Sequence, residues 1–155
     1  MGVWAARDIL SLNRVIAGTE NRFIFDDEEV SYPVRRIRFM PYEKENSVGK
    51  YFDYLQPIGY GQRCLVTSAP KAGKSLFLLD AAKSLCAYSR NRMAFVLLID
   101  QPPELIAAYR KFVPAENLVA TSYEDEPEQH VFAAEFMLKR AKRFTEMGSD
   151  IVFIF

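Results

Sequence analysis

The stretch "SAPKAGKS", residues 68–75, is close to the phosphate-binding loop pattern G-x-x-x-x-G-K-[ST]. Gly73, Lys74 and Ser75 fill the last three places, and Ser68 stands where the pattern has its first glycine. Such loops bind phosphate through backbone N–H groups and the positive end of the following helix. In this pattern Lys74 would contact the β- and γ-phosphates, and the Ser75 hydroxyl would coordinate Mg²⁺. The stretch therefore predicts a nucleotide site.

The residues around this loop predict the strand–loop–helix context that it needs. An apolar run at 64–67 predicts a short strand, and residues 76–88 have helical spacing. Pro70 can shape the turn without the first glycine, and Gly73 lets backbone approach a phosphate closely. The competing interpretation is a chance Gly-Lys-Ser at a helix start, which the flanking strand and helix disfavour.

Alternating apolar and helical runs predict an α/β fold for most of the chain. Further strands are expected at 94–99, 117–120 and 150–155. Helices are expected at 104–112 and from Pro127, which suits a first helical position, to a cap at Gly148. This order is typical of βαβ units. We expect a mostly parallel sheet of four strands with three crossover helices, covered on both faces.

The first part of the chain predicts a small appendage. Residues 1–18 have the apolar spacing of a short helix, and 23–25 and 34–39 predict short strands around an acidic turn. Residues 40–50 are polar and irregular, as in a linker. We therefore expect an N-terminal α/β appendage with linker at 1–50 and a core at 51–155.

Composition limits the classes of function. The chain has 155 residues, half of them hydrophobic, with 20 Lys+Arg against 20 Asp+Glu, so a protein-wide basic surface for nucleic acid is excluded. Cys64 and Cys86 predict small buried hydrophobic side chains in a reducing cytosol. No signal peptide is evident, and no apolar run approaches the roughly 20 residues of a membrane helix. We expect a soluble, cytoplasmic protein.

Four motifs follow one another along the chain: "PIGYGQR" at 57–63, "APKAGKS" at 69–75, "VLLIDQPPEL" at 96–105 and "VATSYEDEPEQHVFAAEFMLKRAKR" at 119–143. In this order they resemble the ATPase core of the bacterial transcription termination factor Rho family. The first alone is less specific, because rotary ATP synthase subunits are similar there. Together, in matching order and spacing, the motifs cover about two-thirds of the chain.

The resemblance implies a RecA-like P-loop ATPase fold, which in this family forms a hexameric ring that couples ATP hydrolysis to movement along RNA. By position, Lys71, Lys74 and Ser75 would contact phosphate and Mg²⁺, so ATP and Mg²⁺ are the implied cofactors. Catalysis in such sites is largely positioning and charge stabilisation. The nucleotide-binding residues are expected to be Ser68, Ala69, Pro70, Lys71, Ala72, Gly73, Lys74, Ser75 and Leu76.

The chain also departs from the family pattern. Gln101 stands at the place of the catalytic glutamate, and glutamine cannot take a proton from water, a help usually worth about 10²–10⁴-fold. Pro102 replaces an arginine. The sequence stops at Phe155, where the family continues with an Mg²⁺-binding aspartate, an arginine finger and RNA-contacting loops. About 45 residues at the start are too few for a complete oligonucleotide-binding barrel. These departures predict a truncated Rho-like protein with little or no hydrolysis.

Other residues have two interpretations. Asp100 is equally consistent with a place near the site and with an N-cap of the next helix. His130, the single histidine, is expected to be structural. A solvated helix end is preferred over RNA binding for the basic cluster Lys139, Arg140, Lys142 and Arg143. Core or linker packing is preferred over contact with a base for Tyr51, Phe52, Tyr54 and Tyr60. A structural role is preferred over remnants of an RNA platform for Phe23, Phe25, Arg36 and Arg38.

Two functions follow. The first is an ATP-binding Rho-like module with little turnover of its own. The alternative is a non-catalytic interaction protein that joins or obstructs a full-length Rho-type ring. The outer side of the strand before the loop would be an unpaired edge, which predicts self-association or a partner that covers it. RNA binding by this chain alone is doubtful, and no membrane contact is expected.

Overall fold

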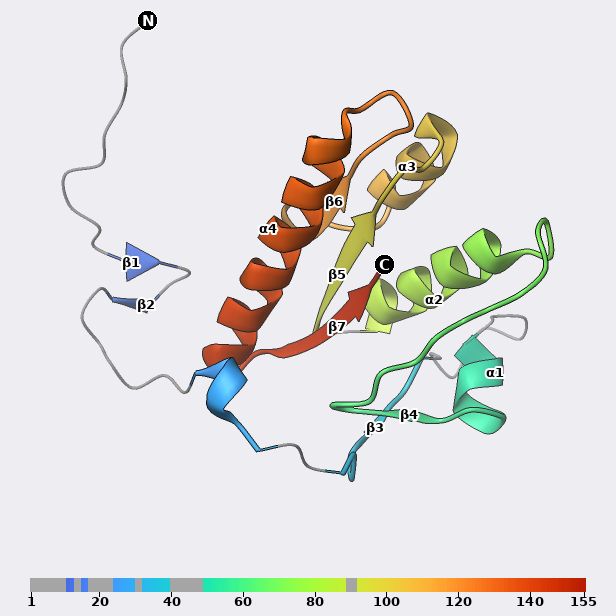
Figure 1. Ribbon diagram of the computed structural model, residues 1–155. Coiled ribbons are helices and arrows are strands. Elements are labelled where there is room, and N and C mark those ends of the chain that lie inside the picture. The colour runs from blue at the N-terminus through green and yellow to red at the C-terminus, as the bar shows by residue number, and fades with distance from the viewer. Residues whose placement is uncertain (1–10, 13–14, 17–23, 30–31, 40–48, 89–91) are drawn as a thin grey trace, which may run out of the picture.

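The computed structural model describes residues 11–12, 15–16, 24–29, 32–39, 49–88 and 92–155. Its largest part is an α/β unit in the second half of the chain (Figure 1). The helices of this unit are α2 (Lys74–Tyr88), α3 (Pro103–Arg110) and α4 (Pro127–Glu146), with a 3₁₀ turn, η2 (Ala115–Asn117). Its strands are β5 (Arg92–Leu98), β6 (Leu118–Ala120) and β7 (Asp150–Ile154). The bounds of these three helices and three strands lie within two residues of the predicted ones, and η2 was not predicted.

The three strands form a parallel sheet in the order β6-β5-β7. The central strand β5 is buried on both faces, because successive side chains of a strand point to opposite sides. Val96 and Leu98 pack against α2 and α3, in a cluster with Leu79 and Ile106. The opposite face of β5 packs against α4 through Phe95, Leu97, Ala133, Met137 and Ala141. The predicted parallel sheet with helices on both faces is therefore confirmed.

Helix α4 begins and ends where the sequence predicts. Pro127 is its first residue, and Glu126 and Gln129 form a capping box that satisfies backbone N–H groups at this end. Glu128 adds negative charge to the first turn, which suits the helix dipole. Gly148 lies just past the end with a φ of 80°, the left-handed conformation that glycine adopts most easily.

The expected strand at 64–67 does not form, so the predicted count of four core strands is not confirmed. Residues 62–69 have no regular secondary structure, Leu65 is 86% exposed, and Cys64 is exposed instead of buried as predicted. A strand needs a hydrogen-bonded neighbour, and within the described residues β7 pairs with β5 alone. Val66 still packs against an apolar cluster, as do Val152 and Ile154 of β7. On this side of the sheet the edge strand is therefore β7, as β6 is on the other side.

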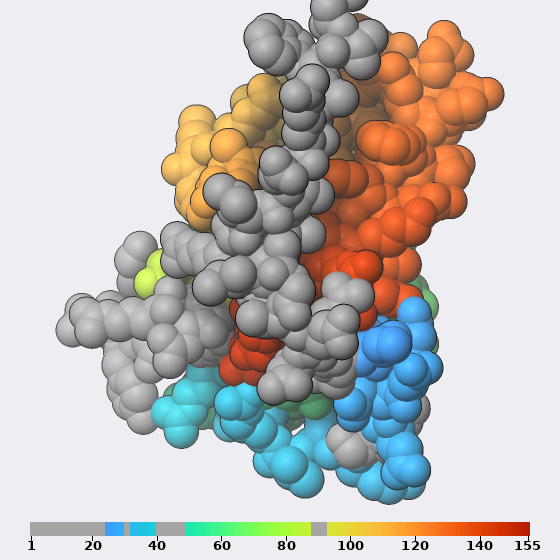
Figure 2. Space-filling view, turned by 90° about the vertical axis from the view of Figure 1, so that its left-hand side faces the viewer, coloured from blue at the N-terminus to red at the C-terminus, as the bar shows by residue number. Residues whose placement is uncertain are grey.

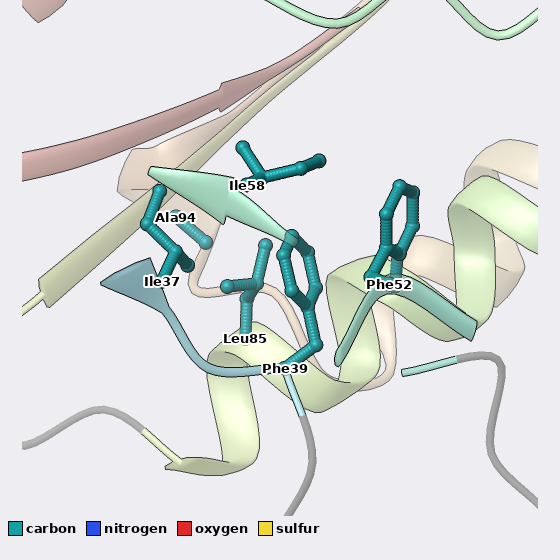
Figure 3. Packing of buried hydrophobic residues seen from close by; sticks show 7 residues of the cluster. Ile37, Phe39, Phe52, Ile58, Leu85 and Ala94 are labelled. Atoms are coloured by element: carbon teal, nitrogen blue, oxygen red, sulfur yellow. The ribbon is translucent and has the colours of Figure 1, made fainter. Parts of the chain in front are cut away.

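The earlier part of the chain contributes to a third apolar cluster (Figure 3). Strand β3 (Arg36–Ile37) pairs antiparallel with β4 (Ile58–Gly59), and α1 (Gly49–Tyr54) precedes β4. The Phe39 and Phe52 rings stack with centroids 4.6 Å apart. These side chains share a cluster with residues of α2 and β5, and its buried members are Ile37, Phe39, Phe52, Ile58, Ala81, Leu85 and Ala94.

Two local predictions near the N-terminus were wrong. Within the expected helix at 1–18, β1 (Ser11–Leu12) and β2 (Val15–Ile16) pair antiparallel. Leu12 lies opposite Val15, so an apolar spacing of three that also fits a helix arises here across strands. In place of the expected strand at 23–25, Phe25–Asp27 is a 3₁₀ helix, η1. The rest of residues 1–18, Phe23 and most of the linker lie outside the described residues.

Polar contacts tie residues 24–39 to the end of the chain. Lys142 pairs with Asp26 at 2.6 Å, and the Phe25 N–H donates to the buried Glu146 carboxylate at 3.2 Å. Arg35 pairs with Asp150, the first residue of β7, at 2.6 Å. Figure 2 shows this segment, blue to cyan, against the red C-terminal part. The division at residue 50 stays a prediction.

No helix in the described part of the chain is both apolar enough and long enough to span a lipid bilayer.

Candidate nucleotide-binding site

The predicted phosphate loop lies between the irregular segment 62–67 and the start of α2. Helix α2 begins at Lys74, so the loop leads directly into a helix N-terminus. The first N–H groups of a helix have no acceptor within it, which makes them available to an anion. Figure 1 shows this end of α2 on the same side of the molecule as the carboxyl ends of β5 and β6. Ligands of open parallel sheets bind at that side.

The loop backbone has the left-handed positions of a tight turn. Lys71 has a φ of 61° and Gly73 a φ of 94°. The Ala72 N–H donates to the Ala69 carbonyl at 3.3 Å, which closes the turn, and the Phe77 N–H donates to Gly73 at 2.9 Å. A β-carbon on Gly73 would meet nothing within 4 Å, so its φ alone requires glycine here. Alternating left-handed positions of this kind orient successive N–H groups toward one side of a loop.

Lys74 and Ser68 connect the two ends of the loop. The Lys74 ammonium donates to the Ser68 carbonyl at 3.2 Å, and the Ser68 hydroxyl donates to the Ala69 carbonyl at 3.1 Å. Every residue from 67 to 76 is exposed, including Ser75 and Leu76, so the predicted binding residues are accessible. The Lys74 ammonium has a weak carbonyl acceptor in this state, and a phosphate would be a stronger one.

The carboxyl end of β5 carries Asp100 and Gln101. Asp100 has a φ of 54°, which is unusual for a residue with a side chain. The N-cap of α3 is Pro102, so the N-cap interpretation of Asp100 is wrong. The Gln101 amide nitrogen donates to the Ile99 carbonyl at 2.9 Å, and the Gln101 N–H donates to the Thr121 carbonyl at 3.1 Å.

Sequence reasoning missed Thr121, which follows β6. Its hydroxyl oxygen lies 2.7 Å from Nδ1 of His130 and 3.4 Å from the backbone nitrogen of Asp100. The side chain is 7% exposed. The expected structural role of His130 is consistent with this contact. One signal was present in the sequence: Thr121 directly follows an apolar run, as Asp100 does, and parallel strands bring such ends together.

The basic cluster at the end of α4 is engaged within the chain. Lys139 pairs with Glu135, Lys142 with Asp26, and Arg143 with Glu146, at 3.2, 2.6 and 3.0 Å. Arg140 donates to the Glu116 carbonyl and lies over the Phe95 ring, 5.3 Å from its centroid. These contacts favour the interpretation of the cluster as a helix end with internal ion pairs over RNA binding.

The residues considered for a base or RNA platform differ in burial. Phe52 is buried, and Arg35 lies 3.9 Å over the Tyr60 ring, which agrees with the packing interpretation. Tyr51 and Tyr54 are 60% and 74% exposed, so packing was the wrong interpretation for these two. Tyr51 lines a hollow of about 510 Å³ between α1 and residues 62–67.

The three RNA-platform candidates that the structure describes also differ. Arg36 bonds Asp53, and Phe25 lies under Lys142, in agreement with a structural role. Arg38 is exposed and has a partner of its own. Phe23 lies outside the described residues.

No protein-family model matches the chain. Several curated proteins do, and those named here are transcription termination factors Rho. The protein of Streptobacillus moniliformis is 33% identical over 137 residues, which is 88% of this chain and 32% of that protein. The protein of Mycobacterium bovis is 35% identical over 121 residues, 78% of this chain and 20% of that protein. The protein of Pseudomonas fluorescens is 31% identical over 137 residues, 87% of this chain and 32% of that protein.

The chain thus spans about a third or less of the relatives that it matches, while the match covers most of the chain. The three relatives named above carry the same name, in agreement with the motif resemblance. By sequence, this chain is similar to transcription termination factor Rho over most of its own length.

Proposed function

We propose that the chain binds Mg·ATP through residues 68–75 and hydrolyses it slowly or not at all. The observation that carries the proposal is an exposed loop, left-handed at Gly73, that leads directly into α2 at Lys74. Lys71 and Lys74 would bind the phosphate oxygens, with the N–H groups of the first turn of α2. The Ser75 hydroxyl would bind Mg²⁺, and Leu76 would flank the nucleotide.

Electrostatics support this assignment. Two lysines lie within four residues of each other in a loop that is open to solvent, and the positive end of the helix dipole adds to their field. On binding, Lys74 would exchange the Ser68 carbonyl for a charged phosphate oxygen, and charge-assisted hydrogen bonds are roughly twice as strong as neutral ones. The hydrogen bond that Lys74 gains with a phosphate is therefore stronger than the one that it gives up with Ser68.

Slow hydrolysis follows from Gln101. The side-chain amide of Gln101 is not a base that can take a proton from water. Its nitrogen donates a hydrogen bond to the Ile99 carbonyl. General-base help is typically worth about 10²–10⁴-fold in rate. Binding with little turnover is the combination that these residues support. The similarity to Rho supports a role in transcription termination, and the RNA contact of such a role would come from other chains.

A second candidate function is supported by the open edge of β7. Within the described residues β7 pairs on one side only. Phe155, directly after β7, is 82% exposed, and Leu65, in the segment before the loop, is 86% exposed. Unpaired edges favour association with another chain. We propose that the chain self-associates or joins full-length Rho-type subunits through this edge, either as a partner or as an obstruction of the ring.

Calorimetric titration with Mg·ATP and Mg·ADP tests the first proposal. We expect micromolar binding that Lys74→Ala removes and that Lys111→Ala, a change of an exposed lysine at the end of α3, leaves unchanged. Circular dichroism of both variants shows whether the fold is kept. Equal binding by wild type and Lys74→Ala, or no binding by the folded wild type, contradicts the proposal and leaves the interaction role as the better one.

A further inference from the structure

Thr121 joins three elements that are distant in sequence. Its N–H donates to the Leu98 carbonyl at 2.8 Å, and its carbonyl accepts from the Gln101 N–H at 3.1 Å. Its hydroxyl oxygen lies 3.5 Å from the Leu98 carbonyl oxygen, 3.4 Å from the Asp100 nitrogen and 2.7 Å from His130 Nδ1. One nearly buried residue after β6 thus contacts the end of β5, the following turn and α4.

The three hydroxyl contacts match what a threonine can offer. A hydroxyl has one hydrogen to donate and two lone pairs that accept. When it donates to the Leu98 carbonyl, the lone pairs accept from the Asp100 N–H and from His130 Nδ1. With this assignment of donors, the proton shared with His130 is on Nδ1, and each of the three contacts has one donor and one acceptor.

The turn held by these contacts has a strained conformation. Asp100 has a φ of 54°, which residues with a β-carbon adopt at an energetic cost. Such a conformation persists where the surroundings hold it. Here the holding contacts are the Thr121 hydroxyl on the Asp100 N–H and the Thr121 carbonyl on the Gln101 N–H. The contacts with Thr121 therefore fix the backbone position of Gln101.

We propose that Thr121, supported by His130, is a positioning residue that fixes the Asp100–Gln101 turn and so sets where the Gln101 amide lies relative to the γ-phosphate of a bound nucleotide. The proposal rests on the proposed function of the 68–75 loop. The loop and the turn both lie toward the carboxyl ends of the strands. Leu79, near the start of α2, shares an apolar cluster with Leu98, the last residue of β5.

Amide hydrogen exchange, read residue by residue by NMR, tests the positioning without any ligand. Thr121→Val removes the hydroxyl and keeps the shape, and Thr121→Ser keeps the hydroxyl as the matched control. We expect exchange at Asp100 to rise about tenfold in Thr121→Val, as loss of one hydrogen bond implies, and to stay near wild type in Thr121→Ser. His130→Leu should act as Thr121→Val does, and His130→Asn should restore slow exchange. Unchanged exchange at Val96 shows that the sheet is intact.

The ratio of the Mg·ADP and Mg·ATP dissociation constants tests the effect on the ligand. We expect Gln101→Ala and Thr121→Val each to reduce the preference for ATP, and the double variant to equal Gln101→Ala, because Thr121 acts through Gln101. Unchanged exchange and ratio in Thr121→Val, or additive effects in the double variant, overturn the proposal while binding itself persists. Failure of the wild type to bind either nucleotide contradicts the proposed function, and the ligand part of this proposal with it.

Discussion

The Lys74 ammonium donates a hydrogen bond to the Ser68 carbonyl at 3.2 Å. Ser68, which stands where the pattern has its first glycine, thus contributes its backbone to this contact. The Ser68 side chain bonds the next carbonyl, that of Ala69, and remains on the loop itself. Ser68 is not among the residues with a left-handed backbone, which are Lys71 and Gly73 in this loop. The departure from the pattern at Ser68 therefore leaves the left-handed positions of the loop intact.

From this geometry, Ser68→Gly should change little. The Ser68 carbonyl remains available to Lys74, and glycine adds only freedom to the unfolded chain, a cost of about 0.5–1 kcal/mol in stability. We expect the dissociation constant of Mg·ATP to stay within about twofold of wild type, since the same N–H groups remain in place. Titration calorimetry measures it, and a tenfold gain would show that the serine impairs the loop.

Gly73→Ala should destabilise the loop and weaken binding. A residue with a β-carbon at a φ of 94° costs about 1 kcal/mol or more, although the β-carbon itself would meet no neighbour. Gly148→Ala is the matched control, because Gly148 has a φ of 80° beyond α4, far from the loop in sequence. Thermal unfolding should show similar losses for both variants, and titration should show lost ATP affinity for Gly73→Ala alone. Equal affinity in both would mean that the loop conformation does not serve binding.

Gln101→Glu should raise turnover of ATP. The carboxylate supplies the base that the amide lacks, and we expect a gain of about 10²-fold, the lower end of general-base help. Gln56→Glu, on an exposed glutamine elsewhere, is the control for added charge. Steady-state phosphate release measures the rate, and a further Lys74→Ala change should abolish it. An unchanged rate in Gln101→Glu would show that the base is not the limiting deficiency.

The parts of the structure that sequence predicts best are those set by local rules. Pro127 and Gly148 mark α4 because proline and glycine have fixed backbone preferences at helix ends. The apolar run of β5 predicts a strand buried on both faces, which the Phe95 and Val96 contacts confirm. The sequence Gly73 to Ser75 also predicts a loop that leads into a helix, and α2 begins at Lys74, whereas its binding of phosphate stays a prediction.

What the sequence did not predict depends on distant partners. The run at 64–67 has strand composition but no hydrogen-bonded neighbour among the residues that the structure describes. The residues of a strand do not by themselves determine whether another strand pairs with it. The Thr121 hydroxyl meets Asp100, which is 21 residues away in sequence, only through the order of the sheet. The pairing of β1 with β2 imitates helical spacing over four residues.

Leu65→Lys should reduce self-association if the segment before the loop and the β7 edge form an interface. Leu65 is 86% exposed, so a charge there costs the monomer little, while it opposes burial in an apolar contact. Thr67→Lys, also at an exposed position, is the control. Sedimentation velocity over a range of concentrations should show a weaker dimer for Leu65→Lys than for Thr67→Lys. A wild-type protein that stays monomeric at all concentrations contradicts the self-association.

Stability should fall between pH 10 and pH 12 because of Tyr109. Burial against α2 and β5 raises the pKa of Tyr109 to about 12 from 10.0, since the phenolate would lose its solvent. The native state therefore keeps its proton where the unfolded state has lost it. The contribution of this group is fully present below pH 10 and decreases as the pH rises to about 12, by about 2–3 kcal/mol in all. Chemical unfolding of wild type and Tyr109→Phe across this range measures it. The phenylalanine variant should lose less stability with pH, and parallel curves for the two proteins would show that Tyr109 ionises as an exposed tyrosine does.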